Sequence, residues 1–499
     1  MAPIQRVFVL GGGSAGFLSA LTLKTRLPQL QVTVLRSPEI GIIGVGEGTT
    51  PPVVTHLHGY LGLDPKAFYE VARPSWKLGI RFLWGPRPSF NYSFGTQLDS
   101  QYQALSRPTG FYAWEDFEYG EITSAHMSLD RAFPKQPNGA PLIELTAAYH
   151  LENETFVTFL EQQARGQGIE VIDGKVTKVQ KGEAGIESLR LESGQELSGD
   201  LFVDCSGFRS LLLGQTLNEP FCSFDSTLFC RRAVIGGWDR TDEQLLPFTV
   251  AETMDSGWCW QIEHEHRINR GYVFSPDFIS DEAAREEFLR KNPRVTDTRF
   301  IDFRSGRFER TWIKNVVAIG NASGFVEPLE STALSAICGQ AQHLAESLVE
   351  TRCMPTLSMQ KQYNKRTARA WDCIRDFLAI HYRFNTRLDT PFWKACRADV
   401  FLGNATELVE YYQENGPSFL WRDTLLDPFD QFRMEGYLVL LVGQKVPFAG
   451  AGEISAEERA IWRRIQAANR QKAENSLTTS EALAIVHSDA WQWTPGYYR

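Results

Sequence analysis

The glycine-rich turn GGGSAG at residues 11–16 constrains the fold of this chain more than any other feature. An apolar run at residues 6–10 leads into the turn, and a helical pattern of apolar residues follows at 17–27. A second apolar run occupies residues 31–35. Apolar runs on either side of a helical pattern are typical of a βαβ unit. The sequence therefore predicts an α/β fold whose first strand, turn, helix and strand span residues 5–36.

The glycines follow the spacing GxGxxG, which has a physical explanation at each position. Gly11 allows a tight turn, Gly13 lets the backbone approach a diphosphate, and Gly16 lets the helix pack closely on the strand. The helix would begin near Ser14 and Ala15, where free backbone amides attract phosphate oxygens. Together with the βαβ pattern, this spacing predicts a dinucleotide site.

The end of the second strand departs from the usual dinucleotide pattern. An acidic residue about 20 positions after the glycines normally binds the ribose hydroxyls. Here Arg36 occupies that place, and Glu39 follows three residues later. Because arginine can accommodate the 2′-phosphate of NADP, an NADP-dependent reductase stays among the alternatives.

Two later segments favour FAD over NADP. GDLFVDCSG at residues 199–207 resembles the strand and turn that close over the dinucleotide in two-domain FAD hydroxylases. VVAIGNASGFVEP at residues 316–328 resembles the last flavin-contacting strand and loop of those enzymes, although Asn321 stands where many of them have aspartate. The resemblance implies that Gly320 and Pro328 contact the flavin.

Four further segments carry a more specific resemblance. They are GVGEGTTPP at residues 44–52, WKLGIRF at 76–82, GWCWQI at 257–262 and GFVEPLESTAL at 324–334. Over most of residues 4–385 the chain resembles the flavin-dependent tryptophan halogenase family. The resemblance implies an α/β fold in which a hydroxylase-like, two-domain FAD-binding body precedes a mainly helical C-terminal lobe.

The division of the chain follows from where the pattern changes. Strand and helix patterns mix up to about residue 350, and helical patterns dominate after it. We predict an FAD-binding body over residues 1–350, with substrate-side insertions near 77–150 and 216–275. A mainly helical lobe is predicted over 351–499.

Two residues are candidates for the catalytic step. Lys77 lies in an alternating run, where the pattern alone is typical of an ordinary lysine on the polar face of a strand. Glu330 precedes a helical pattern, where the negative charge of a glutamate commonly interacts favourably with the helix dipole. The resemblance instead implies that Lys77 receives hypohalous acid. It also implies that Glu330 lies beside the substrate, where it either takes the proton from the ring or polarises the hypohalous acid.

The same resemblance assigns a halide site and a flavin strap. Backbone amides of Thr332 and Ala333, at the start of a helix, would hold chloride or bromide, although the family more often has glycine at position 333. Gly46, Glu47 and Thr50 would belong to a loop over the flavin ring.

A wall between flavin and substrate is implied by GWCWQI. Trp258 and Trp260 match the family pattern, but Glu263 replaces its proline. Two alternating tryptophans could also simply pack one face of a strand. Further aromatic residues would line the substrate side, among them Phe90, Tyr92, Phe94, Phe111, Tyr112 and Trp114.

The resemblance implies an enzyme that uses FADH2, O2 and chloride or bromide to halogenate an electron-rich aromatic such as an indole or tryptophan. Since the chain has one GxGxxG, a separate NAD(P)H-dependent flavin reductase is expected to supply FADH2. A flavin monooxygenase that hydroxylates an aromatic substrate and a non-catalytic flavin-binding protein are the alternatives.

Composition narrows the setting in which the protein works. The net charge of −9 disfavours nucleic acid as a partner, and no apolar run is long enough for a membrane span. Without a signal-peptide pattern, and with eight scattered cysteines, we expect reduced thiols and a cytoplasmic location. His264 and His266 lack a third ligand, so we expect a solvated polar turn and no metal. The amphipathic helices leave room for a homodimer.

Overall fold

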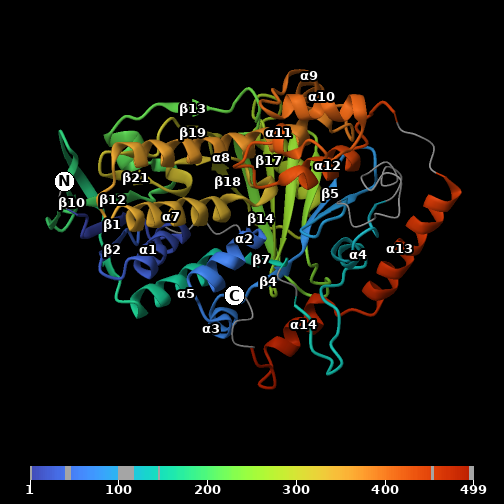
Figure 1. Cartoon of the computed structure of the whole chain (residues 1–499), viewed down its shortest axis with the longest axis horizontal. Helices are drawn as coiled ribbons and strands as arrows, with labels where there is room; N and C mark the ends of the chain where they lie inside the picture. Colours follow the sequence, from blue (N-terminus) through green and yellow to red (C-terminus); the bar gives the residue numbers. More distant parts are fainter. Residues whose placement is uncertain (1–2, 40–45, 99–116, 144–145, 451–454, 494–499) are drawn as a thin grey trace.

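A mostly parallel sheet forms one end of the molecule (Figure 1). The computed structural model describes residues 3–39, 46–98, 117–143, 146–450 and 455–493. The strand order is β20 (Trp312–Ile313), β21 (Val316–Ala318), β12 (Leu201–Asp204), β1 (Arg6–Leu10), β2 (Gln31–Arg36) and β8 (Glu170–Asp173). Neighbouring strands are parallel except β20 and β21. The predicted α/β class is confirmed.

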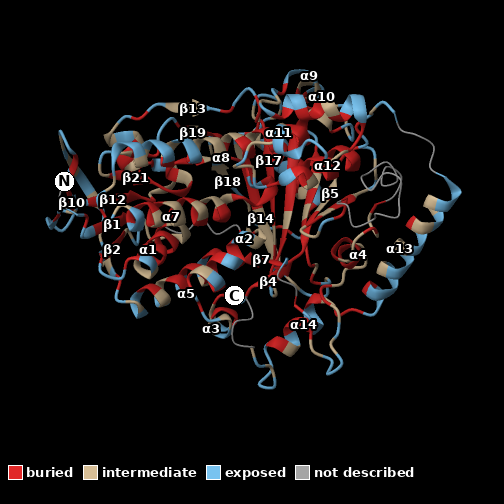
Figure 2. Ribbon diagram, in the orientation of Figure 1, coloured by how far each residue is buried: buried red, intermediate tan, exposed pale blue. Residues whose placement is uncertain are grey.

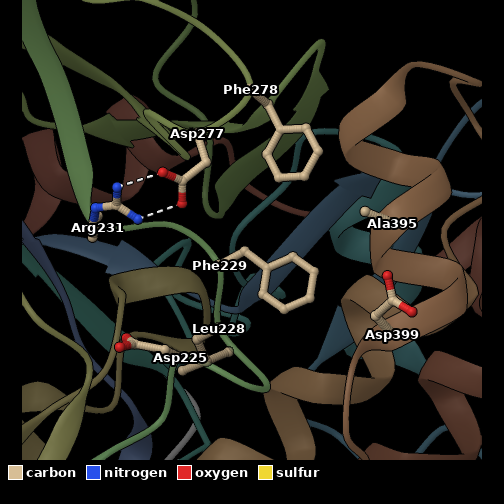
Figure 3. Close-up of a pocket in the computed structure, with 8 residues that line it drawn as sticks. All are labelled: Asp225, Leu228, Phe229, Arg231, Asp277, Phe278, Ala395 and Asp399. Atoms are coloured by element: carbon tan, nitrogen blue, oxygen red, sulfur yellow. Dashed lines mark hydrogen bonds and ion pairs between the residues drawn. The ribbon is translucent and has the colours of Figure 1, made fainter.

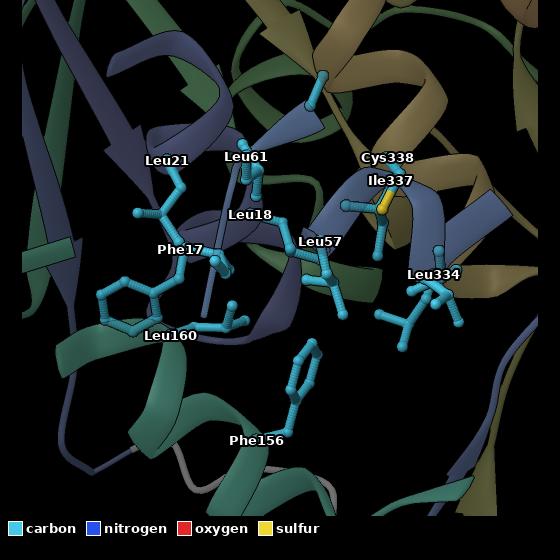
Figure 4. Packing of buried hydrophobic residues seen from close by; sticks show 14 of the residues in the cluster. Phe17, Leu18, Leu21, Leu57, Leu61, Phe156, Leu160, Leu334, Ile337 and Cys338 are labelled. Carbon is cyan, nitrogen blue, oxygen red and sulfur yellow. The ribbon is translucent and has the colours of Figure 1, made fainter. Parts of the chain in front are cut away.

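Three helices cover this sheet and bury its main core (Figure 4). They are α1 (Ser14–Arg26), α5 (Asn153–Gly166) and α7 (Ala333–Glu350). Phe17 and Leu21 of α1, Phe156 of α5 and Ile337 of α7 belong to one buried cluster, in which Leu160 of α5 lies beside Phe17. The helix α1 is buried along most of its length, which explains why its sequence is apolar on nearly every face.

A second, seven-stranded sheet stands in the middle of the molecule (Figure 1). Its order is β18 (Arg299–Asp302), β14 (Arg232–Asp239), β17 (Arg267–Phe274), β16 (Gly257–Glu263), β15 (Thr249–Met254), β5 (Gly79–Leu83) and β6 (Phe90–Ser93). Pairing is antiparallel except between β15 and β5. Most of these strands are buried, and the sheet appears largely red in Figure 2.

A small sheet joins these two regions. Its order is β3 (Glu47–Gly48), β7 (Ala148–Leu151) and β4 (Ser75–Lys77). The run at residues 76–82 was interpreted as one alternating strand, and this is wrong. The chain leaves β4 after Lys77 and enters β5 at Gly79, because Leu78 instead donates its backbone N–H to Pro247 O at 2.7 Å.

The remaining elements before residue 333 are short. The strands form two further three-stranded sheets, β11 (Glu196–Leu197), β10 (Gly185–Leu191) and β9 (Val176–Gly182), and β13 (Phe221–Ser223), β19 (Gly306–Phe308) and β22 (Gly324–Phe325). The helices and helical turns are α2 (Pro51–Val54), η1 (Thr55–Tyr60), α3 (Pro65–Val71), α4 (Ile122–Ser128), η3 (Gly207–Arg209), η4 (Leu211–Thr216), α6 (Asp281–Lys291), η5 (Gly320–Ala322) and η6 (Pro328–Glu330).

From residue 333 onward the described elements are helices. After α7 come α8 (Leu357–Phe384), α9 (Pro391–Asp399), α10 (Ala405–Asn415), α11 (Arg422–Leu425), α12 (Arg433–Gly443), α13 (Ala456–Glu474) and α14 (Thr479–Val486). Helices α8 and α12 share one core with the seven-stranded sheet. Helix α13 lies at the far edge of the molecule and is largely exposed (Figures 1 and 2). The division at residue 350 stays a prediction.

Within the described residues, no helix combines the length and the apolar character needed to cross a bilayer. All eight cysteines are free thiols, and seven of them are buried.

Candidate active site

The glycine turn after β1 has the geometry of a diphosphate cradle. A Cβ on Gly11 (φ +135°) would lie 2.2 Å from Cys205 O, and one on Gly16 would lie 1.8 Å from Gly11 O. Both positions therefore require glycine. A Cβ on Gly13, by contrast, would meet no atom within 4 Å, so its outer face is open.

The start of helix α1 offers that open space to an anion. Gly13 is the N-cap, no side chain caps the helix, and its first turn holds no acidic residue. The amides that begin at Ser14 and Ala15 are thus available to phosphate oxygens. These residues fit the diphosphate of a dinucleotide.

Arg36 is already paired with carboxylates. Its Nε donates to Asp173 Oδ1 at 2.6 Å, and its Nη1 contacts Glu161. These two carboxylates raise the pKa of Arg36 despite its partial burial. A guanidinium that already pairs with two carboxylates is a poor binding site for the 2′-phosphate of NADP. This pairing argues against the NADP-dependent alternative.

The strap segment packs against the start of helix α5. Gly46 N donates to Asn153 Oδ1 at 3.1 Å, and Asn153 Nδ2 donates to the Glu47 carboxylate. Burial raises the pKa of Glu47 to about 7. Thr50 is the N-cap of the short helix α2. Residues 44 and 45 of this segment lie outside the described residues.

Lys77 is fully buried at the end of β4. Burial lowers the pKa of its ammonium to about 7, although the charge of Glu330 partly opposes this shift. Lys77 Nζ donates to Ser331 Oγ at 2.7 Å and lies 5.4 Å from the centroid of the Phe94 ring. An ordinary lysine on a polar strand face would be exposed, so that interpretation is wrong.

Glu330 is also buried, at the end of the helical turn η6, and is near enough to Lys77 for its charge to act on the lysine. Its Oε1 lies 2.7 Å from Nε2 of His381 on helix α8, and the two atoms form a hydrogen bond. Ser331 follows in the left-handed conformation (φ +55°), which redirects the chain into α7. The sequence analysis missed Ser331 and His381 as members of the site. His381 sits in a long helix pattern that gives no local signal.

Helix α7 begins where the halide site was predicted. Thr332 is its N-cap and no side chain caps it, so the first amides, including those of Thr332 and Ala333, lack a capping side chain. Ala333 is the first helical residue and has no positive φ. The backbone therefore does not require the glycine that the family more often has there.

Trp258 and Trp260 lie side by side on the buried face of β16, with ring centroids 6.0 Å apart. Trp258 Nε1 donates to Glu327 Oε1 at 2.9 Å, and the Tyr382 hydroxyl donates to the same oxygen. Burial raises the pKa of Glu327 to about 7. Glu327 joins Trp258 to the loop that carries Glu330, and no local sequence signal points to this glutamate.

Glu263 replaces the family's proline with an ion pair. Its side chain is inaccessible and contacts Arg240, while Gln261 Nε2 donates to it at 2.6 Å. Its backbone carbonyl accepts the hydroxyl of Ser75, two residues before Lys77, at 2.6 Å. These contacts fix the end of β16 without proline.

His264 corrects the expectation of a solvated turn. The turn joins β16 to β17, but His264 is buried, and burial lowers its pKa to about 3. Only its neighbour His266 is exposed. The part of the chain that the structure describes contains no group of three or more His, Cys, Asp or Glu side chains that could hold a metal ion.

The substrate side is described in part. Tyr92 is half-buried on β6, with its ring 6.2 Å from that of Phe377, and burial raises its pKa well above the ordinary range. Phe90 is buried on the same strand. Phe111, Tyr112 and Trp114 lie outside the described residues.

A surface cavity of about 520 Å³ lies elsewhere and holds none of the predicted site residues (Figure 3). Phe229 and Phe278 form its apolar walls, and Arg231 and Asp277 pair across one edge at 2.6 Å.

Comparison with known proteins places the chain in a family. The model of the tryptophan halogenase family matches residues 6–455. Tryptophan 6-halogenase ThaL of Streptomyces albogriseolus is 32% identical over 445 residues, which cover 83% of each chain. Tryptophan 7-halogenase RebH of Lentzea aerocolonigenes is 31% identical over 438 residues, or 82% of each chain.

Solved structures agree with that result. MibH, a lanthipeptide tryptophan 5-halogenase, superposes with a TM-score of 0.88 at 37% identity, covering 98% of this chain and 96% of MibH. BrvH, a flavin-dependent halogenase from Brevundimonas sp. BAL3, superposes with a TM-score of 0.83 at 28% identity, covering 96% and 99%. The chain belongs to the tryptophan halogenase family of flavin-dependent halogenases.

Proposed function

We propose that this halogenase uses FADH2, O2 and chloride or bromide to halogenate the indole ring of tryptophan or a related electron-rich arene, and that Lys77 delivers the halogen. The observation that carries the proposal is a fully buried lysine whose pKa is lowered to about 7, beside the buried Glu330. A buried lysine with a lowered pKa and an acidic residue nearby is typical of catalytic sites.

The flavin site and the halide site are proposed from adjacent elements. Reduced FAD together with O2 supplies the oxidising power that converts the halide to hypohalous acid. The glycine cradle at Gly13 and helix α1 would hold the dinucleotide, and the strap at Gly46 would cover its ring. The amides of Thr332 and Ala333 at the start of α7 would hold the halide.

Lys77 would hold the hypohalous acid for the aromatic ring. Its ammonium donates a hydrogen bond to the oxygen of the acid, which makes the halogen more electrophilic. The ring carbon forms a bond to the halogen while the oxygen–halogen bond breaks, and the released hydroxide takes up a proton from the Lys77 ammonium to become water. The ring then loses its proton, so that arene and hypohalous acid give haloarene and water. The proton released from the ring, passed on by Glu330, then restores the ammonium.

Glu330 would take up the ring proton. His381 Nε2 occupies Oε1 of this carboxylate, so its second oxygen is available for the proton. The contact with His381 would hold the carboxylate in one orientation near Lys77, as a general base requires.

Trp258 and Trp260 would separate the arene from the flavin. Both side chains are buried, and Glu327 holds the indole N–H of Trp258. A fixed wall of this kind supports halogenation over direct hydroxylation, because only a small oxidant could pass it.

Two features of the partners follow from the same reasoning. A separate NAD(P)H-dependent reductase would supply FADH2, since the chain holds one dinucleotide motif. The substrate could be free tryptophan or a tryptophan within a peptide. The 37% identity to MibH, which covers nearly the whole chain, supports including a peptide in the test.

The test is halogenation with a reconstituted system. The purified protein receives FAD, a flavin reductase, NADH, O2 and bromide, with free tryptophan, indole, phenols and a tryptophan-containing peptide as separate substrates. Mass spectrometry should find the bromine isotope doublet with the native protein and lose it with Lys77→Ala. A product that gains oxygen would establish a monooxygenase, and flavin binding without any product would establish a non-catalytic flavoprotein.

A further inference from the structure

The ring of His381 on helix α8 is enclosed by aromatic side chains and makes two polar contacts. The side chain is fully buried, and its ring lies 5.2 Å from the Phe82 ring and 6.3 Å from the Trp84 ring. Its Nδ1 lies 3.1 Å from Phe377 O, one helical turn earlier, and its Nε2 lies 2.7 Å from Glu330 Oε1. Both ring nitrogens are therefore hydrogen-bonded, one to the backbone and one to the carboxyl group.

The backbone contact fixes the position of one proton on this ring. A carbonyl oxygen carries no hydrogen, so the hydrogen bond to Phe377 O requires a proton on Nδ1. The hydrogen bond between Nε2 and Glu330 Oε1 requires a second proton, which belongs either to the imidazole or to the carboxyl group. The Glu330–His381 pair therefore holds one proton more than a neutral histidine beside a carboxylate, and its net charge is zero.

The charge balance of the site involves this pair, Lys77 of β4 and Tyr92 of β6. The charge of Glu330 acts on both of these side chains. Burial raises the pKa of Tyr92 well above the ordinary range, so its phenol is neutral. With a neutral pair, the protonated site carries only the positive charge of the Lys77 ammonium. Because an uncompensated buried charge is costly, proton transfers that keep this total constant are favoured.

We propose that His381 stores a proton for Glu330 during halogenation, so that the two residues act as one base. The inference rests on the proposed function of Glu330. When the C–H bond of the arene breaks, its electron pair returns to the ring and the proton binds Glu330 Oε2. The proton between the two residues then lies on His381 Nε2. The pair thus carries the positive charge that Lys77 gave up when it protonated the released hydroxide.

The burial of His381 directs the stored proton back to the reaction centre. The ring is fully buried and its Nδ1 is bonded to the backbone, so the imidazole releases the proton through Glu330. Glu330 then returns a proton to Lys77, and the site regains its starting charge. A neutral hydrogen-bond donor at position 381 would orient the carboxyl group but could not take up a proton. His381 is therefore a positioning residue whose effect can be separated from simple orientation.

The first test locates the protons directly and needs neither flavin nor substrate. In protein with isotopically labelled histidine nitrogens, magnetic resonance correlation spectra distinguish protonated from unprotonated ring nitrogens. The signals that disappear in His381→Gln belong to His381, and they should show a proton on Nδ1 and a shared proton on Nε2. In Glu330→Gln the new carboxamide can donate to Nε2, which should become unprotonated while Nδ1 keeps its proton.

This measurement has two outcomes that would overturn the inference. One is a native His381 without a proton on Nδ1, and the other is a His381 signal that Glu330→Gln leaves unchanged. If His381→Gln does not fold, the protonation states of the native histidines still decide the question, since one of them must show both protons and respond to Glu330→Gln.

The second test asks whether removal of the ring proton becomes slow without the imidazole. The bromination assay receives an equal mixture of ring-hydrogen and ring-deuterium forms of the arene that the native protein brominates best. Since attack of the halogen precedes C–H cleavage, the native protein should brominate both forms equally. In His381→Gln the deuterated form should lag, and total product should fall about tenfold, because the base is weakened. Equal bromination of both forms by this variant would mean that orientation alone suffices, which overturns the inference.

A buried histidine outside the site provides the matched control. His56 lies on η1, and its Nε2 is 3.0 Å from Thr22 Oγ1 of helix α1. His56→Gln replaces a comparable buried ring by the same carboxamide, yet its product should show no preference for hydrogen over deuterium. A preference as large as that of His381→Gln would show a general effect of packing and overturn the inference.

The outcomes separate this inference from the proposed function. Failure of the native protein to brominate any arene, or full activity of Lys77→Ala, contradicts the proposed function itself, whereas the histidine spectra can still be recorded. Bromination that depends on Lys77 and Glu330, together with a His381 that lacks the Nδ1 proton or an isotope preference that His381→Gln leaves absent, contradicts only the role of His381.

Discussion

At the scale of single residues, burial defines the chemistry of Lys77. The side chain is inaccessible, and its pKa is lowered to about 7 because the charged form is poorly solvated there. The unfolded chain binds this proton more tightly than the folded chain does. The contribution of Lys77 to the free energy of unfolding therefore increases as the pH rises from about 7, the pKa in the folded chain, to 10.5, the ordinary pKa of a lysine.

The same pKa predicts how halogen transfer depends on pH. If the ammonium form holds the hypohalous acid, the fraction of hypobromous acid that ends in brominated product should be highest below pH 7. This ratio divides the brominated product by the total hypobromous acid, where a soluble halogen trap measures the acid that escapes. It should then fall toward tenfold per pH unit above that value. Using the ratio removes the pH dependence of flavin reduction and of acid formation. A constant ratio from pH 6 to pH 9 would contradict an ammonium role.

Glu263 illustrates a departure from the family pattern that the structure explains. The sequence showed only that proline was missing, because the partner Arg240 lies 23 residues away and carries no motif. Removing one charge from a buried ion pair leaves the other uncompensated. Glu263→Gln should therefore lower the free energy of unfolding by about 3–5 kcal/mol, measured by urea denaturation.

An exposed ion pair on the neighbouring strands provides the control. Asp239 and Arg267 are 3.3 Å apart, with side chains 88% and 46% exposed. Asp239→Asn should cost less than about 1 kcal/mol because water screens the pair. A similar loss in the free energy of unfolding for both variants would mean that the buried Glu263–Arg240 pair stabilises the fold no more than an exposed pair does.

At the scale of elements, the βαβ unit could be predicted because its signals are local. The turn and helix at residues 11–26 follow from glycine spacing and apolar period alone. The break between β4 and β5 could not, since the hydrogen bond from Leu78 to Pro247 joins segments far apart in the sequence. Likewise, Glu327 and His381 reach Trp258 and Glu330 through tertiary contacts that no local pattern encodes.

Helix α7 provides a prediction about the halide. A negative charge at Ala333 should repel a halide held by the first amides, whereas an amide of the same shape should not. Ala333→Asp should raise the bromide concentration for half-maximal hypobromous acid formation roughly tenfold over Ala333→Asn. Both variants should keep the native circular dichroism spectrum. An equal bromide dependence in the Ala333→Asp and Ala333→Asn variants would show that the halide does not bind at this end of the helix.

At the scale of the whole molecule, ligand binding should appear as stability. A ligand that binds only the folded chain raises the free energy of unfolding, by about 2.7 kcal/mol at 100 times its dissociation constant. FAD should therefore raise the melting temperature measurably, whereas NADP should not, because Arg36 is already neutralised. A larger shift with NADP would reverse the cofactor assignment.

Gly13 offers a variant that separates ligand binding from folding. Its backbone is extended (φ −94°, ψ −171°) and a Cβ would meet nothing within 4 Å, so Gly13→Ala should melt like the native protein without ligand. The added methyl would occupy the space of the diphosphate, so the FAD-induced shift should shrink. Gly16→Ala is the opposite case, because its Cβ would lie 1.8 Å from Gly11 O and destabilise the unliganded chain.

The small sheet of β3, β7 and β4 has a consequence for how such enzymes can diversify. Lys77 pairs with Ala148 of β7, and Gly48 pairs with His150 of the same strand, so the lysine belongs to the strap's framework and not to the seven-stranded sheet. Under the proposed function, oxidant delivery would therefore lie on the small sheet and part of arene recognition on the seven-stranded sheet. Under the proposed function, mutations in β6 would reshape the pocket for a new arene without changing Lys77, whereas helix α8 would have to keep His381, which contacts Glu330. The fold thus permits substrate scope to evolve, or to be engineered, without rebuilding the chemistry.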